Sequence, residues 1–350
     1  MKPLVLHVAA FSNPAGGGFV SALQSLAKRS EFRTALLCPR ASESYAWTHA
    51  LRASGVDVIH ASTALDVAAA VARSGPDVVH AHFVDWMLPA TLGATAAHAR
   101  TAWHLHSAVT PSRGARSLAR RLKYASAKRL VERFFCVAPD IVEYLRQHRV
   151  RPDAIVELPN GVDLEHFRSP TLVERAAARR LFHLAPHDRA IAFFGRDAVV
   201  KGADLLASAL RLTHEKPQIL AIAASPASLQ ALGDERIIST GTLSDVRDAL
   251  WAADALALPS RGEGIAYSLL EARACGLPAV ASALPGVLRA LGSDPATLAV
   301  DSGDAAALAH ALDCALALGP VPLLPATAAA ISLDHWVEEL AAWYVTDLAA

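Results

Sequence analysis

Short apolar runs alternate with longer, alanine-rich segments of helical character along almost the whole chain. This alternation is typical of parallel βα units, in which each strand is followed by a helix that packs back on the sheet. In the first half, the pattern predicts strands over 4–9, 34–38, 56–60, 77–82, 101–106, 133–138 and 154–158. In the second half, it predicts strands over 190–195, 218–223, 236–239, 255–259, 278–282 and 297–300, with helical segments such as 202–214, 244–252 and 266–275.

The periodicity lapses near the middle of the chain, where Pro159 and the pair Asn160-Gly161 are strong turn signals. A chain of 350 residues also exceeds the size of about 250–300 residues at which single cores stop growing. We therefore expect an α/β protein with two Rossmann-like, doubly wound parallel-sheet domains facing a central cleft. The predicted domains are 1–168 and 169–334, with a C-terminal helix over about 335–350 that packs back on the first domain.

Composition excludes several classes of protein. Hydrophobic residues make up 53% and charged residues 19% of the chain, so an intrinsically disordered chain is excluded. The 33 Lys and Arg residues balance the 33 Asp and Glu residues, which argues against a general nucleic-acid binder. The four cysteines lie far apart and form no zinc-binding cluster. No apolar run reaches the length of a membrane span, and we expect a cytoplasmic protein.

Ligands of doubly wound sheets bind outside the carboxyl ends of the strands, so the residues that follow each strand are the candidates for a site. After the first strand, Gly16, Gly17 and Gly18 lead into a helix. Glycines let the backbone approach a ligand closely, and the amides at the start of the helix favour an anion. The spacing differs from a dinucleotide-binding loop, because Ser21 stands where a third Gly or Ala is needed. A purely structural turn is the alternative.

The first predicted strand of the second half ends in a turn with two cations. Arg196 and Lys201 flank this turn, which precedes a helix. Arg offers a planar fork and Lys a point charge, a combination suited to a diphosphate. Two solvated surface cations are the alternative interpretation.

The segment 259–278 carries two acids eight residues apart, Glu263 and Glu271. A retaining glycosidase needs its carboxyl groups about 5–5.5 Å apart. Eight residues of helix span about 12 Å, so the pair fits polar recognition at two ends of one ligand better than a glycosidase.

With these segments in hand, the chain resembles the retaining glycosyltransferases of the GT-B fold, in family 4 of the nucleotide-sugar-dependent enzymes. The resemblance covers nearly the whole chain. Its markers are Gly16-Gly17-Gly18, Asp77-Val78-Val79-His80-Ala81-His82, His104-Leu105-His106, Asn160-Gly161-Val162-Asp163, Gly195-Arg196 with Lys201-Gly202, and Glu263 with Glu271.

The resemblance implies a role for each of these positions. Arg196 and Lys201 would bind the donor diphosphate, Glu271 the ribose, and Glu263 the sugar. The catalytic candidates are accordingly His106, Arg196, Lys201 and Glu263, with His106 rather than His104 contacting the sugar. Further donor contacts would come from Gly17, Gly18, Thr242, Leu243, Gly264, Ile265 and Ala266. Ile265-Ala266 departs from the Phe-Gly that is common in the family, which leaves the identity of the donor sugar open.

The resemblance also implies the chemistry: transfer of a hexose or N-acetylhexosamine from a nucleotide diphosphate sugar, with UDP as the expected nucleotide and retention at the anomeric carbon. No enzyme nucleophile, metal or other cofactor is expected. The acceptor is open between a surface glycan, a lipid-linked glycan and a small metabolite. The alternatives are a nucleotide-sugar epimerase or phosphorylase of the same architecture, and a catalytically silent nucleotide-sugar-binding subunit.

One strongly basic segment follows the strand that ends at His106. Residues 112–133 hold eight cations and one acid, Glu132. We place this segment on the acceptor side, where Gly18, His106, Arg113 and Arg116 are the candidate residues. It is either a solvated basic face, a contact with the anionic inner face of a membrane or a lipid phosphate, or a site for another anionic acceptor.

Overall fold

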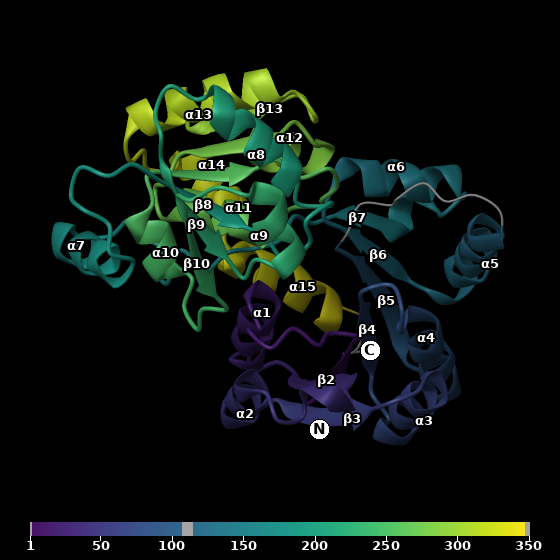
Figure 1. Cartoon of the computed structure of the whole chain (residues 1–350). Helices are drawn as coiled ribbons and strands as arrows, with labels where there is room; N and C mark the ends of the chain where they lie inside the picture. The colour runs from purple at the N-terminus through teal and green to yellow at the C-terminus, as the bar shows by residue number, and fades with distance from the viewer. Residues whose placement is uncertain (1, 107–114, 347–350) are drawn as a thin grey trace. The chain divides into compact units, whose positions relative to one another are not determined.

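The computed structural model describes residues 2–106 and 115–346 and, in the second range, side chains from residue 123 onward. The chain divides into two compact units, Met1–Gly161 with Leu333–Ala350, and Val162–Ser332. Each unit has one parallel sheet with helices around it (Figure 1). The expected α/β class with two doubly wound sheets is therefore confirmed.

The sheet of the first unit has seven parallel strands in the order β3-β2-β1-β4-β5-β6-β7. The strands are β1 Leu4–Ala9, β2 Arg33–Pro39, β3 Asp57–Ala61, β4 Val78–His82, β5 Arg100–Leu105, β6 Arg133–Cys136 and β7 Ile155–Glu157. The helices between them are α1 Gly18–Ala27, α2 Ala46–Ala53, α3 Ala64–Ser74, α4 Met87–Ala96, α5 Ala115–Leu130 and α6 Pro139–Gln147. Short 3-10 turns occur at Arg40–Ser42 and Pro152–Ala154.

The second unit has six parallel strands in the order β10-β9-β8-β11-β12-β13. They are β8 Ala190–Phe194, β9 Gln218–Ile222, β10 Ile237–Gly241, β11 Ala255–Leu258, β12 Ala279–Ser282 and β13 Thr297–Val300. The helices are α7 Leu172–Leu181, α8 Ala203–Leu212, α9 Pro226–Leu232, α10 Arg247–Ala252, α11 Tyr267–Ala274, α12 Pro285–Leu291, α13 Ala305–Leu318 and α14 Pro325–Ala330. Each strand that the sequence pattern predicts is present in the two units, with ends that differ by at most two residues.

Both faces of the sheet in the first unit are covered, which explains why its strands are apolar throughout. All six residues of β1 are buried. Leu6 and Val8 pack with side chains of α3, α4, α5 and α6 on one face. Val5, on the other face, packs with α1 and with α15 Leu333–Val345, and Figure 1 shows α15 beside α1. The strands therefore carry little sequence signal for which face each residue occupies.

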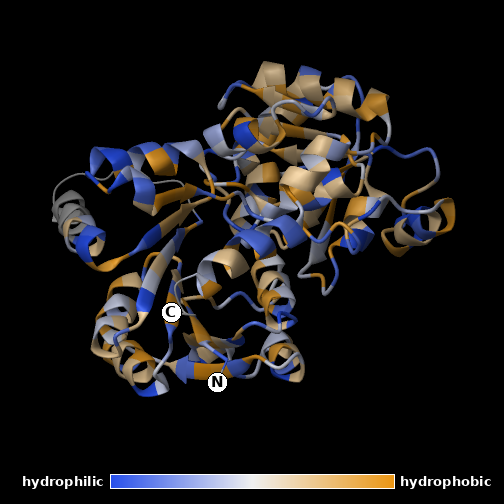
Figure 2. Cartoon of the chain, turned by 180° about the vertical axis from the view of Figure 1, so that it is seen from behind, coloured by the Kyte–Doolittle hydropathy of each residue, from blue (hydrophilic) through white to orange (hydrophobic). Residues whose placement is uncertain are grey.

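The C-terminal helix α15 completes the core of the first unit. Trp336, Leu340 and Tyr344 recur every four residues and lie on the buried face of the helix. Hydrophilic residues cover the opposite sides of many helices (Figure 2). In the described parts of the chain, every helix falls short of the length or the hydropathy of a membrane span.

A fully buried ion pair holds α11 in the second unit. The guanidinium of Arg273 on α11 donates to both oxygens of Asp294, at 2.6 and 3.1 Å, and to the carbonyls of Leu277 and Val321. Both charged side chains are 0% exposed. Thr297, the first residue of β13, adds a hydroxyl hydrogen bond to Asp294 at 2.6 Å. This network fixes α11 against the chain that leads into β13.

Removing the acid of this pair should destabilise the protein strongly. Asp294→Ala leaves the buried Arg273 guanidinium without its counter-charge, and such losses cost about 3–5 kcal/mol. The measurement is the free energy of unfolding in urea. The matched control is Glu31→Ala, which breaks the surface pair with Arg29 and should leave the urea midpoint unchanged. Equal midpoints for the two variants would contradict this account.

Candidate active site

The turn after β8 carries the two predicted phosphate-binding cations. The backbone amides of Val199 and Val200 donate to the Asp197 carboxylate at 3.0 and 2.8 Å, and this closes the turn. Arg196 is exposed, and no described residue accepts a hydrogen bond from its guanidinium. Lys201 lies at the end of the turn, directly before Gly202, which is the N-cap residue of α8. Both cations therefore lie at the carboxyl edge of the second sheet.

Gly202 lets this turn meet the loop after β11. Its φ is +68°, and a Cβ at this position would lie 2.1 Å from the carbonyl oxygen of Pro259. No side chain can be accommodated at that distance, so only glycine allows the two loops to touch. Glycine at 202 is thus a steric requirement of the site.

The contact brings a cation of one loop onto an acid of the other. The Lys201 ammonium donates to Glu263 Oε1, and the two side chains are 20% and 15% exposed. The buried Ser260 hydroxyl donates to the same oxygen at 3.0 Å. The residues assigned to the diphosphate and to the sugar are therefore paired with each other in this structure.

Arg261, which the sequence interpretation left without a role, ties the same two loops together. Its amide donates to the carbonyl of Val200 at 2.8 Å, and its guanidinium donates to the carbonyl of Val199. The guanidinium also donates to both oxygens of Asp204 in the first turn of α8, at 2.8 and 2.7 Å. Arg261 therefore holds the turn that carries Lys201 in place.

Glu271, the predicted ribose ligand, lies in the middle of α11 and is 7% exposed. Burial, with a smaller contribution from the nearby charge of Asp245, raises the pKa of its carboxyl to about 7. At neutral pH the group is therefore close to half ionised. A buried carboxylate of this kind is suited to accept hydrogen bonds from a pair of ligand hydroxyls.

The other predicted donor contacts fall into two groups. Thr242 is exposed and Leu243 partly exposed, directly after β10. Ile265 and Ala266 are 3% and 6% exposed, and their side chains pack in the core of the second unit. With these side chains turned inward, a ligand can meet this segment, together with the buried Gly264, only through the backbone.

In the first unit, the glycine loop lies between β1 and α1. Gly16 and Gly17 have φ values of +71° and +72°, and Gly17 caps the start of α1. The space at Gly17 is open: a Cβ there would have no neighbour within 4 Å among the described residues. Gly17 is exposed and Gly18 is partly exposed, so the start of α1 is accessible from solvent.

His106 follows β5 at the carboxyl edge of the first sheet and is the partly exposed member of a column of histidines whose other four members are buried. His7 lies on β1, His80 and His82 on β4, and His104 on β5. In the pairing registers His7 is opposite His80 and His82 is opposite His104, so all point to the face that α1 and α15 cover. Burial lowers the pKa of His106 to about 4 and that of His7 to about 3, so these imidazoles are neutral at pH 7.

This column offers histidine nitrogens close enough to be tested as a metal site. The sets His7, His80, His82 and His82, His104, His106 each have nitrogens within 4.8 Å of one another. The rings of His104 and His106, however, are stacked 4.2 Å apart and inclined by only 5°. Imidazole lone pairs lie in the ring plane, so two stacked rings cannot both point at one ion. In the first set, Nδ1 of His7 lies 2.9 Å from Nε2 of His82 and Nδ1 of His80 lies 2.6 Å from the Tyr344 hydroxyl, distances that fit hydrogen bonds.

Aromatic rings surround His106, and the sequence interpretation missed them. The Phe83 ring stacks on the His106 imidazole at 4.8 Å, and Phe83 has the left-handed φ of 59° that is rare for a non-glycine residue. Phe11 packs 5.7 Å from Phe83 and 5.8 Å from Trp47. Trp47 donates to the carbonyl of Asn13, which leads into the glycine loop. The loop and His106 thus share one aromatic support.

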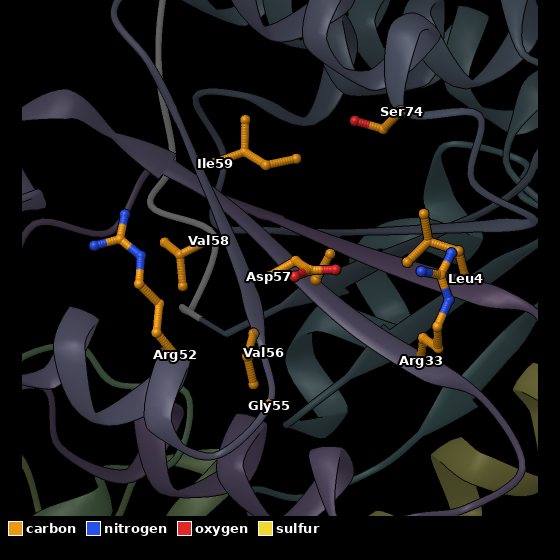
Figure 3. Close-up of a pocket in the computed structure, with 10 residues that line it drawn as sticks. Leu4, Arg33, Arg52, Gly55, Val56, Asp57, Val58, Ile59 and Ser74 are labelled. Carbon is orange, nitrogen blue, oxygen red and sulfur yellow. The ribbon is translucent and has the colours of Figure 1, made fainter.

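A cavity lies elsewhere in the first unit, at the amino-terminal edge of its sheet. It has a volume of about 640 Å³ and is lined by residues that include Leu4, Arg33, Arg52, Asp57 and Ser74 (Figure 3). Leu4, Arg33 and Asp57 are at or next to the first positions of β1, β2 and β3. Ligands of parallel sheets bind at the opposite edge, so this cavity is not part of the candidate site.

The structure groups the predicted residues by unit. In the second unit it joins Lys201 to Glu263, and in the first it joins His106 to the support of the glycine loop. Arg113 lies outside the described residues, and the side chain of Arg116 in α5 does too. The spacing of His80 and His82, and of His104 and His106, was a sequence signal for the histidine column, because alternate residues of a strand share a face.

Comparisons with known proteins identify the family and the fold. The family model described as "Glycosyltransferase Family 4" matches residues 62–166, and the model "Glycosyl transferases group 1" matches residues 188–317. The two segments take in more than half of the chain and cover parts of both units.

Among curated relatives, a D-inositol 3-phosphate glycosyltransferase of Mycobacterium sp. (strain KMS) is 33% identical over 192 residues, 50% of this chain and 42% of the relative. The enzyme of the same description from Saccharomonospora viridis is 30% identical over 288 residues, 73% of this chain and 64% of the relative. The aligned segments thus span less than two thirds of these relatives.

The fold is shared over the whole length with a solved structure, Anabaena Alr3699/HepE in complex with UDP and glucose. The TM-score is 0.81 at 16% sequence identity, and the match covers 97% of this chain and 99% of the other. With the fold, the two matching models and these relatives agreeing, the chain belongs to glycosyltransferase family 4 and has the GT-B fold.

Proposed function

We propose that this protein is a retaining glycosyltransferase that moves a hexose or N-acetylhexosamine from a nucleotide diphosphate sugar, with UDP as the nucleotide, to a hydroxyl of an acceptor. The observation that carries the proposal is the pairing of Lys201 with Glu263 at the carboxyl edge of the second sheet. Beside this pair lies the exposed Arg196, whose guanidinium has no hydrogen-bond partner among the described residues. The similarity to a protein whose structure holds UDP and glucose supports the choice of nucleotide.

Donor binding exchanges the partners of the Lys201–Glu263 pair. The diphosphate draws the Lys201 ammonium away from the carboxylate and meets the exposed guanidinium of Arg196. Glu263, still bound by the Ser260 hydroxyl, then has a carboxylate ready to accept a hydrogen bond from a sugar hydroxyl. The buried Glu271 takes the ribose hydroxyls. The charges that pair with each other in this structure are therefore the same charges that bind the donor.

Catalysis comes mainly from stabilising the negative charge that develops on the leaving diphosphate. The bond between the anomeric carbon and the phosphate oxygen breaks, and its electrons pass to the diphosphate, which gains negative charge. Arg196 and Lys201 stabilise this charge more in the transition state than in the ground state. The acceptor oxygen bonds to the anomeric carbon on the same face, and its proton goes to the leaving phosphate. This step needs no enzyme nucleophile, and with two cations at the diphosphate we propose that it needs no metal.

The acceptor side of the proposal rests on the first unit. The open backbone at Gly17 and Gly18 is suited to a close approach, and the partly exposed Phe11 and Phe83 rings next to His106 are suited to the apolar face of a sugar ring. These features support a glycan or glycoside acceptor. Relatives described as acting on D-inositol 3-phosphate make that compound the second acceptor to test.

A screen of nucleotides tests the function in one pass. We expect UDP and UDP-sugars to raise the melting temperature more than GDP, ADP or TDP and their sugars, because the chain binds them in the folded state. The best donor should then transfer its sugar with retention, as NMR of the product's anomeric proton reports. An epimerised sugar would replace the proposal with an epimerase, and tight nucleotide binding without turnover on any acceptor would replace it with a silent subunit.

Variants of the two cations test the mechanism within that screen. Arg196→Ala and Lys201→Ala should each lower kcat by about 10²–10³-fold, the usual effect of losing one charge-stabilising group. The assay contains EDTA, so the result also tests metal independence. The control is Arg211→Ala, an exposed cation near the opposite end of α8, which should keep the wild-type kcat. Wild-type kinetics for Arg196→Ala and Lys201→Ala would remove the diphosphate assignment.

The raised pKa of Glu271 predicts a pH dependence of nucleotide binding. Above pH 7 both oxygens of its carboxylate can accept hydrogen bonds from the ribose hydroxyls, whereas protonation below pH 7 removes the charge and turns one of the two acceptors into a donor. Between pH 8 and pH 6 the affinity for UDP should therefore fall by about tenfold. Glu271→Gln cannot ionise, so its residual pH dependence reports the phosphate alone. Isothermal titration calorimetry showing the same pH profile for both proteins would contradict the assignment.

We further propose that the basic segment 112–133 attracts an anionic surface on the acceptor side. Among its described side chains, Arg129 is exposed, Lys128 is partly exposed and neighbouring Leu130 is 43% exposed. Cations beside an exposed apolar residue are suited to the headgroup region of an anionic bilayer.

Vesicle sedimentation tests this contact. The protein should sediment with phosphatidylglycerol vesicles at low salt and be released as salt rises, because salt screens the attraction. The double variant Lys128→Glu with Arg129→Glu should lose the binding. Arg180→Glu with Arg211→Glu, which makes the same change of charge in the second unit, should retain it. Binding that is insensitive to salt, or equal losses in the two variants, would overturn this proposal.

A further inference from the structure

Three of the five histidines in this column, His7, His82 and the partly exposed His106, form a chain of hydrogen bonds that ends at the candidate active-site residue. Nδ1 of His7 lies 2.9 Å from Nε2 of His82, and Nδ1 of His82 lies 3.0 Å from Nε2 of His106. The chain continues from Nδ1 of His106 to Oδ1 of Asn160 at 3.3 Å. Each link joins the Nδ1 of one ring to a different acceptor, so the whole chain has a single direction.

The two ends of the chain decide that direction. Asn160 Oδ1 can only accept, so Nδ1 of His106 carries the proton. Nε2 of His106 then has a lone pair and accepts from Nδ1–H of His82, whose Nε2 in turn accepts from Nδ1–H of His7. This order leaves a bare lone pair at His7 Nε2, which has no partner among the described residues. The reverse order would bury an unpaired N–H there, which native structures avoid more strongly.

From this geometry we propose that His82 is a positioning residue for His106: by donating Nδ1–H to Nε2 of His106, it acts together with the acceptor Asn160 to keep the His106 proton on Nδ1. The proposal rests on the proposed function, because it states whether His106 donates or accepts the hydrogen bond in its contact with the sugar. His106 acts as a hydrogen-bond donor to an oxygen of the bound substrate, in place of the long bond to Asn160, and not as a base.

The other two histidines of the column, His80 and His104, do not take part in this chain of hydrogen bonds. His80 lies outside it, because its Nδ1 is 2.6 Å from the hydroxyl of Tyr344 on α15. His104 also lies outside it: within the described structure, neither of its ring nitrogens has a hydrogen-bond partner. Yet His104 is as buried as His82 and is stacked on His106. His104 is therefore a matched control for His82: it is equally buried and also contacts His106, but it donates no hydrogen bond to it.

The experiment reads the tautomers directly, in the full chain. Long-range ¹H–¹⁵N spectra of protein labelled with ¹⁵N-histidine distinguish Nδ1–H from Nε2–H rings, and the His106 signals are assigned by their absence in His106→Gln. We expect the Nδ1–H pattern for His106 and His82 in the wild type. In His82→Leu, which has no donor, only the 3.3 Å bond to Asn160 holds the His106 proton on Nδ1, so part of the His106 population should shift to the Nε2–H pattern. The kcat should fall by about 10–100-fold while the affinity for UDP stays unchanged.

Two further variants separate positioning from packing. The side-chain nitrogen of Asn stands where Nδ1 of His stands, so His82→Asn should restore both the Nδ1–H pattern of His106 and most of the kcat. His104→Leu should leave the tautomer of His106 and kcat as in the wild type. If His82→Leu does not fold, the wild-type spectrum and His82→Asn still decide the proposal.

Several results would overturn the proposal. They are an Nε2–H pattern for His106 in the wild type, an unchanged His106 tautomer in His82→Leu, an equal change in His104→Leu, and one equivalent of a transition metal in the purified protein. The spectra require no turnover. Absence of glycosyl transfer with an intact Nδ1–H pattern would therefore count against the proposed function, while a wrong tautomer in an active enzyme would count against this inference alone.

Discussion

The donor half of the candidate site depends on the contact between two loops of the second unit. Gly202 and the carbonyl of Pro259 are so close that no side chain fits between them. This approach places the ammonium of Lys201 on the carboxylate of Glu263, and it lets Arg261 reach across to Asp204. A single steric condition therefore assembles a cation, an acid and their clamp at the edge where parallel sheets bind ligands.

In the first unit, the histidines beside the candidate site bury polar nitrogens in the core. Five imidazoles occupy a sheet face that apolar side chains could fill, and several of their nitrogens have no partner among the described residues. Such groups cost stability, so their presence requires a benefit elsewhere. The hydrogen bonds from His7 through His82 to His106 supply one, because they define how the last ring presents its proton.

Much of the fold follows from local sequence signals. The strands were predictable because apolar runs and turn residues are read within a few positions, and the site candidates followed because functional residues come directly after strands. The roles of Gly202 and Arg261 were not predictable in this way. Gly202 abuts a residue 57 positions later, and Arg261 reaches back the same distance to Asp204.

The hydrogen bonds between the histidines also could not be predicted from local sequence. The i, i+2 spacing of His80 and His82 indicates a shared face, but not which ring bonds to which. That depends on the register between β1, β4 and β5, and on Tyr344 of α15, which is 264 residues from its partner His80. Phe83 was missed because its aromatic role depends on a left-handed backbone that no sequence pattern of this chain announces.

Hydrogen–deuterium exchange with and without UDP-glucose tests most directly whether the second unit binds the donor. The account predicts slower exchange at 195–204 and 260–271, the loops joined at Gly202 and the helix of Glu271, with no change in α3 of the first unit. Unchanged exchange in both segments at saturating UDP-glucose, or protection confined to the first unit, would contradict it.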